Sequence, residues 1–124
     1  MELIRSVMLV MGITLLAGCS IPPAQKQALP DTGYLSYAAN WVGINRCVET
    51  KQLSPDTGSL GLQYTRAELS NFTYDAARLE REVIAFAAME PPSAAWCSSA
   101  AMNIATKKRR IDQNNADVEA NKKK

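Results

Sequence analysis

The apolar residues of this chain form one continuous block near the N-terminus and, further along, several segments with a helical repeat. The block covers residues 7–17, with the sequence VMLVMGITLLA, and follows a short segment that contains Arg5. A helix that crosses a bilayer needs about 20 apolar residues, whereas the apolar part of a secretion signal needs only about 7–15. We therefore interpret residues 1–18 as a signal peptide that is removed from the mature protein.

Further along the chain, apolar residues recur every three or four positions, which is the period of an α-helix. The repeat predicts a first helix over residues 34–53, a weaker one over 56–70 and the strongest one over 72–90. A fourth helix is expected to begin after Ser93. No segment shows a convincing alternation of apolar and polar residues of the kind that strands have. The expected architecture is therefore all-α, a small bundle of three or four helices.

Capping residues and prolines set the expected ends of these helices. Asp31 or Thr32 can cap the first helix, Thr73 the third and Ser93 the fourth, because their side-chain oxygens accept hydrogen bonds from free backbone N–H groups. Pro55 ends the first helix, since a proline disfavours helical backbone in the residue before it. These signals divide the region into separate helices rather than one long helix.

Composition divides the mature chain into a linker, a domain and a tail. Residues 19–33 contain three prolines and a glycine without an apolar repeat, which is typical of a flexible linker. The helical domain covers residues 34–106. Residues 107–124 carry seven basic and three acidic side chains, and we expect this tail to extend the last helix or to be disordered. Its basic residues 107–110 either bind anionic lipid or an acidic partner, or complement the C-terminal dipole of a solvated helix.

The motif Leu16-Ala17-Gly18-Cys19 begins with the last two residues of the apolar block and continues with the two residues that follow it. In order, spacing and distance from Met1 they resemble the lipobox of bacterial lipoproteins. The resemblance implies that Cys19 becomes the mature N-terminus and carries a covalent diacylglycerol and an N-acyl chain. Several acyl chains anchor a protein far more stably than one. Ser20 stands where an Asp would resemble the inner-membrane retention signal, so the implied location is the outer membrane, with the domain facing the periplasm.

With Cys19 lipidated, two cysteines remain in an oxidising compartment. Cys47 and Cys97 then allow one intramolecular disulfide, which would close a loop of 50 residues. In the chain-entropy description such a cross-link stabilises a fold by about 4 kcal/mol. The alternative is a pair of buried free thiols. The chain has no C-x-x-C motif, so thioredoxin-like redox chemistry is not indicated.

The composition of the chain argues against catalysis and cofactor binding. It contains no histidine, which excludes imidazole metal sites and the Ser-His-Asp and Cys-His nucleophile systems. Acidic residues lie near basic ones at helical spacing, as Arg78 and Glu82 do, rather than in a cluster. A net charge of +2 is too small to indicate nucleic-acid binding. We therefore expect no enzyme activity, no metal or other bound cofactor, and no small-molecule substrate.

A second resemblance rests on three short stretches, which are Asn45-Arg46-Cys47, Leu53-Ser54-Pro55-Asp56 and the segment CSSAAMN that begins at Cys97. Together with an acylated cysteine, a proline-containing tether and a helical bundle with cysteines in its first and last helices, they are similar to the pilotins of type II secretion systems. The resemblance implies a protein that binds the C-terminal segment of an outer-membrane secretin, which folds as a helix on the bundle. The pilotin then carries the secretin to the outer membrane by its own lipid anchor.

A pilotin-like protein needs an apolar groove for the partner helix. The candidates for this groove are Tyr34, Tyr37 and Trp41 on the first expected helix and Leu60 on the second. The aromatic residues also fit the repeat of a buried core. In that alternative they are all buried, and the chain is a structural or exclusion lipoprotein of the envelope with no secretin partner. The solvent exposure of the four side chains distinguishes the two hypotheses.

Overall fold

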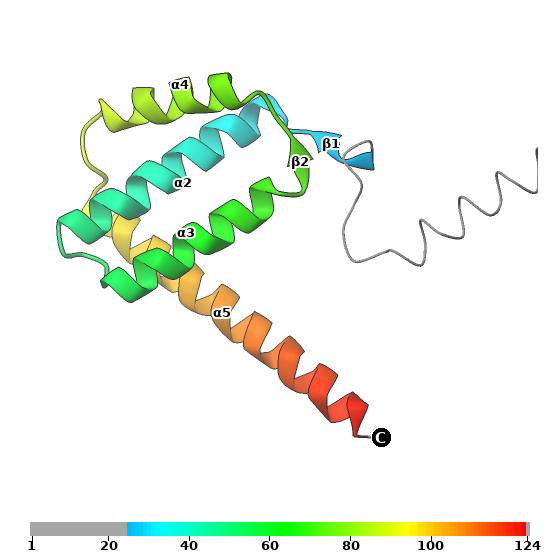
Figure 1. The fold of residues 1–124 in the computed structure, drawn as a ribbon. Helices are drawn as coiled ribbons and strands as arrows, with labels where there is room; N and C mark the ends of the chain where they lie inside the picture. Colours follow the sequence, from blue (N-terminus) through cyan, green and yellow to red (C-terminus); the bar gives the residue numbers. More distant parts are fainter. Residues whose placement is uncertain (1–24, 124) are drawn as a thin grey trace, which may run out of the picture.

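The computed structural model describes residues 25–123, and the predicted signal peptide and Cys19 lie outside them. The described elements follow one another as β1 (Gln27–Ala28), α2 (Asp31–Glu49), α3 (Pro55–Leu69), β2 (Phe72–Thr73), α4 (Ala76–Ala87) and α5 (Ala94–Lys122). Four helices dominate this part of the chain (Figure 1). The predicted all-α class and the helical bundle are therefore confirmed.

The central element of the bundle is α2, which lies between α3 and α4 (Figure 1). The short turn after α2 makes α3 antiparallel to it, whereas α4 runs in the same direction as α2. Both α3 and α4 pack mainly against α2 rather than against each other. The last helix, α5, begins beside the C-terminal end of α2 and then contacts α3. The faces of α2 therefore decide where each of the other helices lies.

The turn between α2 and α3 makes the first helix end at Glu49, four residues before its predicted end. The helix ends at Glu49 because the Cys47 carbonyl accepts hydrogen bonds from the amides of Gln52 at 2.8 Å and Leu53 at 3.0 Å. Lys51 reverses the chain with a positive φ of 62°. These bonds satisfy a carbonyl that would otherwise lack a helical partner. As a result, Leu53 is brought back into the core instead of extending the helix.

Two short strands correct the prediction of a flexible linker. β1 pairs with β2 in parallel, and the Leu29 amide also donates to the Thr73 carbonyl at 2.8 Å. This end of the predicted linker is therefore held on the domain. The first helix begins directly after Pro30, so Asp31 and Thr32 lie inside α2 and neither of them caps it. Strands of two residues are too short to show an alternating pattern in the sequence.

The predicted cap is wrong for α4 and is confirmed for α5. Thr73 does not cap the third helix, because it lies in β2. The cap is Asp75, whose carboxylate accepts a hydrogen bond from the Arg78 amide at 3.1 Å. Ser93 caps α5 as predicted, since its hydroxyl accepts a hydrogen bond from the Trp96 amide at 3.1 Å. Pairing with β1 therefore delays the start of α4 relative to the sequence prediction.

Buried side chains gather in two clusters along α2. The cluster at the C-terminal end of α2 consists of Ile44, Cys47, Leu53, Cys97 and Ile104. The cluster at its N-terminal end consists of Tyr34, Leu69 and Leu79. Two glycines let α5 approach the first cluster closely. A Cβ at Gly43 would overlap the Trp96 indole, and a Cβ at Gly61 would lie 2.6 Å from the Cδ1 atom of Ile104.

The last helix continues well beyond the rest of the fold. It extends to Lys122, so the predicted helical extension of the last helix is what the structure shows over the described part of the tail. The side chains of residues 108–123 are all exposed. Figure 1 shows this part of α5 projecting away from the other helices. The projecting half therefore contributes nothing to the two core clusters.

Candidate binding face

A disulfide joins the last turn of α2 to the first turn of α5. The sulfur atoms of Cys47 and Cys97 lie 2.05 Å apart and the two Cα atoms 5.7 Å apart. Both side chains are fully buried. The predicted disulfide is confirmed, and the alternative of two free thiols is wrong. The bond fixes α5 on the helix that carries most of the predicted groove residues.

The four predicted groove residues do not share one open face. Tyr34 is only 5% exposed and belongs to the N-terminal core cluster. Its hydroxyl accepts a hydrogen bond from the Asp75 amide at 2.8 Å, which ties α2 to the start of α4. Leu60 packs against the other core cluster. Only Tyr37 and Trp41 lie next to each other, and both are partly exposed. Tyr34 is therefore a core residue, and Leu60 is a partly buried residue that packs on the core.

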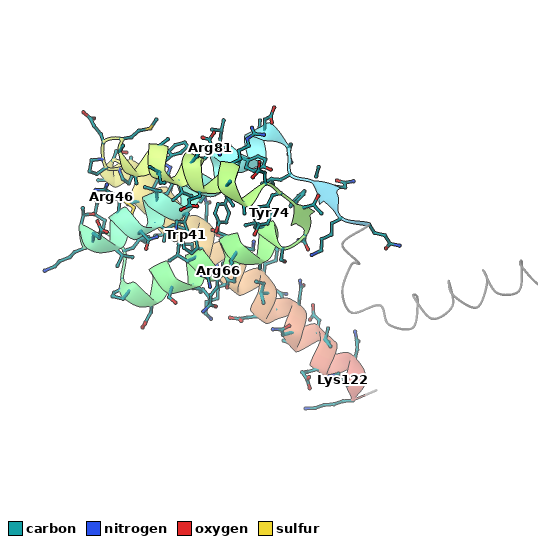
Figure 2. The ribbon with its side chains drawn as sticks, turned by 45° about the horizontal axis from the view of Figure 1, so that its top comes forward. Trp41, Arg46, Arg66, Tyr74, Arg81 and Lys122 are labelled. Carbon is teal, nitrogen blue, oxygen red and sulfur yellow. A yellow bond between two sulfur atoms is a disulfide. The ribbon has the colours of Figure 1, made fainter. Side chains whose placement is uncertain are left out.

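Tyr37 and Trp41 form an aromatic stack on α2. Their ring centroids lie 5.8 Å apart, with 13° between the ring planes. The Arg66 guanidinium lies 5.1 Å from the Trp41 ring centroid, within the range of a cation–π contact. Figure 2 shows Trp41 between α3 and α4, with Arg66 on the α3 side. Burial raises the pKa of the Tyr37 phenol above 10.0, and the positive charge of Arg66 opposes this rise.

A groove of about 450 Å³ lies between α2 and α4 and includes Trp41. Its apolar lining consists of Trp41, Val42, Val83 and Ala87, and its polar lining consists of Asn45, Arg46 and Glu49. The Arg46 guanidinium donates a hydrogen bond across the groove to the Ala87 carbonyl at 2.6 Å. This carbonyl lies in the last turn of α4, where carbonyls lack helical partners. The lining of the groove is therefore a mixture of apolar and polar side chains.

Two arginines border the aromatic stack without a carboxylate partner. Within residues 25–123, neither Arg46 nor Arg66 forms an ion pair. Arg46 stands at the end of the groove near Ala87, and Arg66 stands over Trp41 on the opposite side. Glu49 is the acidic residue in the groove lining. The face around Trp41 thus offers positive charge next to partly exposed aromatic surface.

Two smaller hollows lie on the α3 side of α2. One, of about 180 Å³, is lined by the start of α2 and the end of α3, and the other, of about 160 Å³, is lined by α2, α3 and α5. They share Asn40, Thr65 and Glu68. Lys107 of α5 pairs with Glu68 at 2.6 Å at their common border. Their shared residues are polar, but the larger of the two is lined mainly by apolar surface and includes Tyr37, one of the predicted groove residues.

Sequence reasoning found the aromatic half of this face but missed its other half. The spacing of Tyr37 and Trp41 placed them on one side of a helix. Val83, Ala87 and Arg66 complete the face from α4 and α3. No local signal marks them, because their position depends on how α3 and α4 pack on α2. Arg46 belongs to the stretch Asn45-Arg46-Cys47 that is similar to pilotins, and that resemblance assigns it no role.

Comparison with known proteins gives no independent assignment. No family model matches the chain, and neither a curated protein nor a solved structure matches it. Within residues 25–123, none of the helices has both the length and the apolar character needed to traverse a bilayer. The function is therefore argued from the lipobox-like sequence and from the geometry around Trp41.

Proposed function

We propose that this chain is a lipid-anchored protein of the bacterial envelope that binds a helical segment of a partner protein, in the manner of a pilotin. The observation that carries the proposal is the Tyr37–Trp41 stack beside the groove between α2 and α4. Tryptophan and arginine are the residues that most often dominate binding energy at protein interfaces. Here Trp41 is partly exposed, and Arg66 and Arg46 stand on either side of it.

The dimensions of the groove suit a short amphipathic helix. Its lining on α2 extends from Trp41 to Glu49, a distance of about 12 Å along a helix axis. This corresponds to roughly two turns of a docked helix, which would present an apolar side chain to Trp41 and Val83. The polar edge of such a helix would then face Arg46 and Asn45. Binding of this kind needs no catalytic group and no cofactor.

The proposed anchor gives this binding its cellular role. An acylated Cys19 would hold the domain at the outer membrane on its periplasmic side, because several acyl chains together give stable attachment. A partner that docks on the groove would then be brought to the same membrane. For a pilotin-like protein the partner is a secretin subunit. Replacing Cys19→Ala should release the protein from the outer-membrane fraction, and unchanged fractionation would contradict the anchor.

Two observations favour the alternative of a structural or exclusion lipoprotein. Of the residues predicted for the groove, Tyr34 lies in the core and Leu60 is partly buried against it. The face that remains is smaller than one formed by all four residues. In this alternative the groove has no secretin partner. Binding to a secretin distinguishes the two functions.

The experiment compares two variants of α4 in the full-length lipidated protein. Ala87→Gln places a larger side chain in the groove, while Ala85→Gln places the same side chain at an exposed position outside the groove lining. Glutamine is a good helix former, so the two variants should fold with equal stability. Each variant is co-expressed with the secretin of the host, and the amount of secretin that co-purifies is measured.

We expect Ala87→Gln to reduce co-purification about tenfold and Ala85→Gln to leave it unchanged. Loss of about 1.4 kcal/mol of binding energy gives that factor, and we expect it because the glutamine side chain would occupy space that the docked helix needs. Failure of the unmodified protein to retain any secretin would favour the alternative function. Equal binding by both variants would instead place the interface outside the groove.

A further inference from the structure

The projecting half of α5 points toward the end of the domain at which the N-terminal segment joins it. Lys107 contacts Glu68 near the C-terminal end of α3, and β2 follows shortly after that end and pairs with β1. In Figure 1 α5 runs from the end of the domain near the α2–α3 turn obliquely past α3, so that its tip and β1 lie on the same side of the view but well apart, and Figure 2 shows Lys122 at that tip. The projecting helix and the start of the described chain therefore extend toward the same side of the domain.

Two lengths set how close this end must be to the proposed anchor. Gln27, where β1 begins, lies eight positions after Cys19, and even a fully extended chain over these eight steps spans at most about 28 Å. The part of α5 beyond Lys107 extends about 22 Å as a helix. Residues 27–29 are hydrogen-bonded to β2, so they cannot add to the length of the segment after Cys19 unless this pairing breaks. A membrane that holds Cys19 therefore lies within about 28 Å of Gln27, a distance comparable to the length of the projecting helix.

The charges on the projecting half are mostly positive and partly unpaired. Residues 108–123 contain five basic and three acidic side chains. Two of the acids are paired within the helix, by Lys108 with Asp112 at 2.7 Å and by Lys122 with Glu119 at 3.3 Å. Within the described residues, three cations have no carboxylate partner, namely Arg109, Arg110 and Lys123. Arg109 donates only a long hydrogen bond to the Thr106 hydroxyl at 3.4 Å, so these exposed cations can bind an external anion.

We propose that residues 108–123 of α5 rest on the anionic phospholipid headgroups of the membrane that holds the acyl chains. This inference depends on the lipid anchor of the proposed function, because the anchor brings the helix to the surface. Arg109 and Arg110 bind headgroup phosphates, and Lys123 adds to the attraction at the tip. The contact fixes the orientation of the domain, so that the groove beside Trp41 has a defined position relative to the membrane.

The size of the effect follows from the net charge. Each basic residue close to an anionic membrane contributes about 1 kcal/mol, so two net positive charges correspond to a roughly thirtyfold preference for an anionic over a neutral surface. The preference should fall as salt is added, since the attraction acts within a screening length of about 8–10 Å at physiological ionic strength. Apolar insertion would be far less sensitive to salt.

The test uses a fluorophore whose emission reports contact with lipid. Because Cys47 and Cys97 are bonded and an acylated Cys19 has no free thiol, Asn121→Cys introduces a unique labelling position near the tip of α5. Ser59→Cys provides the matched control, at an exposed position in the first turns of α3, at the other end of the domain. The labelled full-length lipoprotein, after processing, is reconstituted in phosphatidylcholine vesicles with and without phosphatidylglycerol.

We expect the label at position 121 to change its emission only on vesicles that contain phosphatidylglycerol, and the label at position 59 to show no change. Combining Arg109→Gln with Arg110→Gln should remove the roughly thirtyfold preference, while Lys51→Gln, at an exposed turn, should not. An unchanged signal at position 121, or equal signals at both positions, would overturn the proposal. Intact mass measurement shows whether Cys19 is acylated; an unacylated protein would refute the anchor, and this inference with it.

Discussion

Removal of the bond between Cys47 and Cys97 is expected to lower the free energy of unfolding by about 4 kcal/mol. The bond closes a loop whose ends are 50 residues apart in the sequence, and the chain-entropy relation gives that value for such a loop. Small domains are typically stable by only about 5–15 kcal/mol. Without the bond, a large part of the stability of this fold would therefore be lost.

The measurement is denaturant unfolding followed by circular dichroism, with the oxidised protein as reference. Two forms lacking the bond are compared: the reduced protein, and the variant that combines Cys47→Ala with Cys97→Ala. Both sulfur atoms are buried, so the alanine variant loses packing as well as the cross-link. The reduced protein keeps both sulfurs and isolates the effect of the cross-link. Its midpoint should lie well below that of the oxidised protein.

A further consequence concerns the place where the stability is lost. Cys97 lies in the first turn of α5, and that helix has fewer contacts with α2 than α3 and α4 have. The bond should therefore matter most for the attachment of α5. A reduced protein whose unfolding free energy falls by less than about 1 kcal/mol would refute the reasoning. That result would mean that the unfolded chain is already as restricted without the bond as with it.

Two further substitutions test single contacts by the same unfolding measurement. Tyr34→Phe removes the acceptor of the Asp75 amide, a hydrogen bond of 2.8 Å, and should cost about 0.5–1.5 kcal/mol; no change in stability would show that water replaces the hydroxyl without loss. Gly43→Ala adds a Cβ that would overlap the Trp96 indole, and should cost about 1–3 kcal/mol through overpacking. Glycine replacement inside a helix normally stabilises by about 1 kcal/mol, so a gain in stability would contradict the close approach seen here.

The sequence predicted those features that depend on neighbours along the chain. The cap at Ser93, the position of α3 and the aromatic spacing of Tyr37 and Trp41 all follow from local patterns. The disulfide followed from a count of the remaining cysteines once Cys19 was assigned to lipid. Such predictions need only the period of a helix and the chemistry of single residues.

The features that the sequence did not predict arise from contacts between distant segments. The pairing of β1 with β2 joins residues more than forty positions apart, and it removes Thr73 from the helix that it was expected to cap. In the same way, periodicity grouped Tyr34 with Tyr37 and Trp41 but could not show that Leu69 and Leu79 would cover Tyr34. Which side of a helix is covered is decided by its partners, and a single sequence does not identify them.

The attachment of α4 has a consequence for the groove itself. This helix has 12 residues, too few to persist alone in water, and it packs mainly on α2. The other wall of the groove is covalently fixed through Cys47. The wall formed by α2 is therefore fixed. The wall formed by α4 can open by local unfolding, which needs less free energy than unfolding of the whole domain. A partner wider than the resting groove would be admitted by displacement of α4, and its affinity would then include the free energy of that displacement.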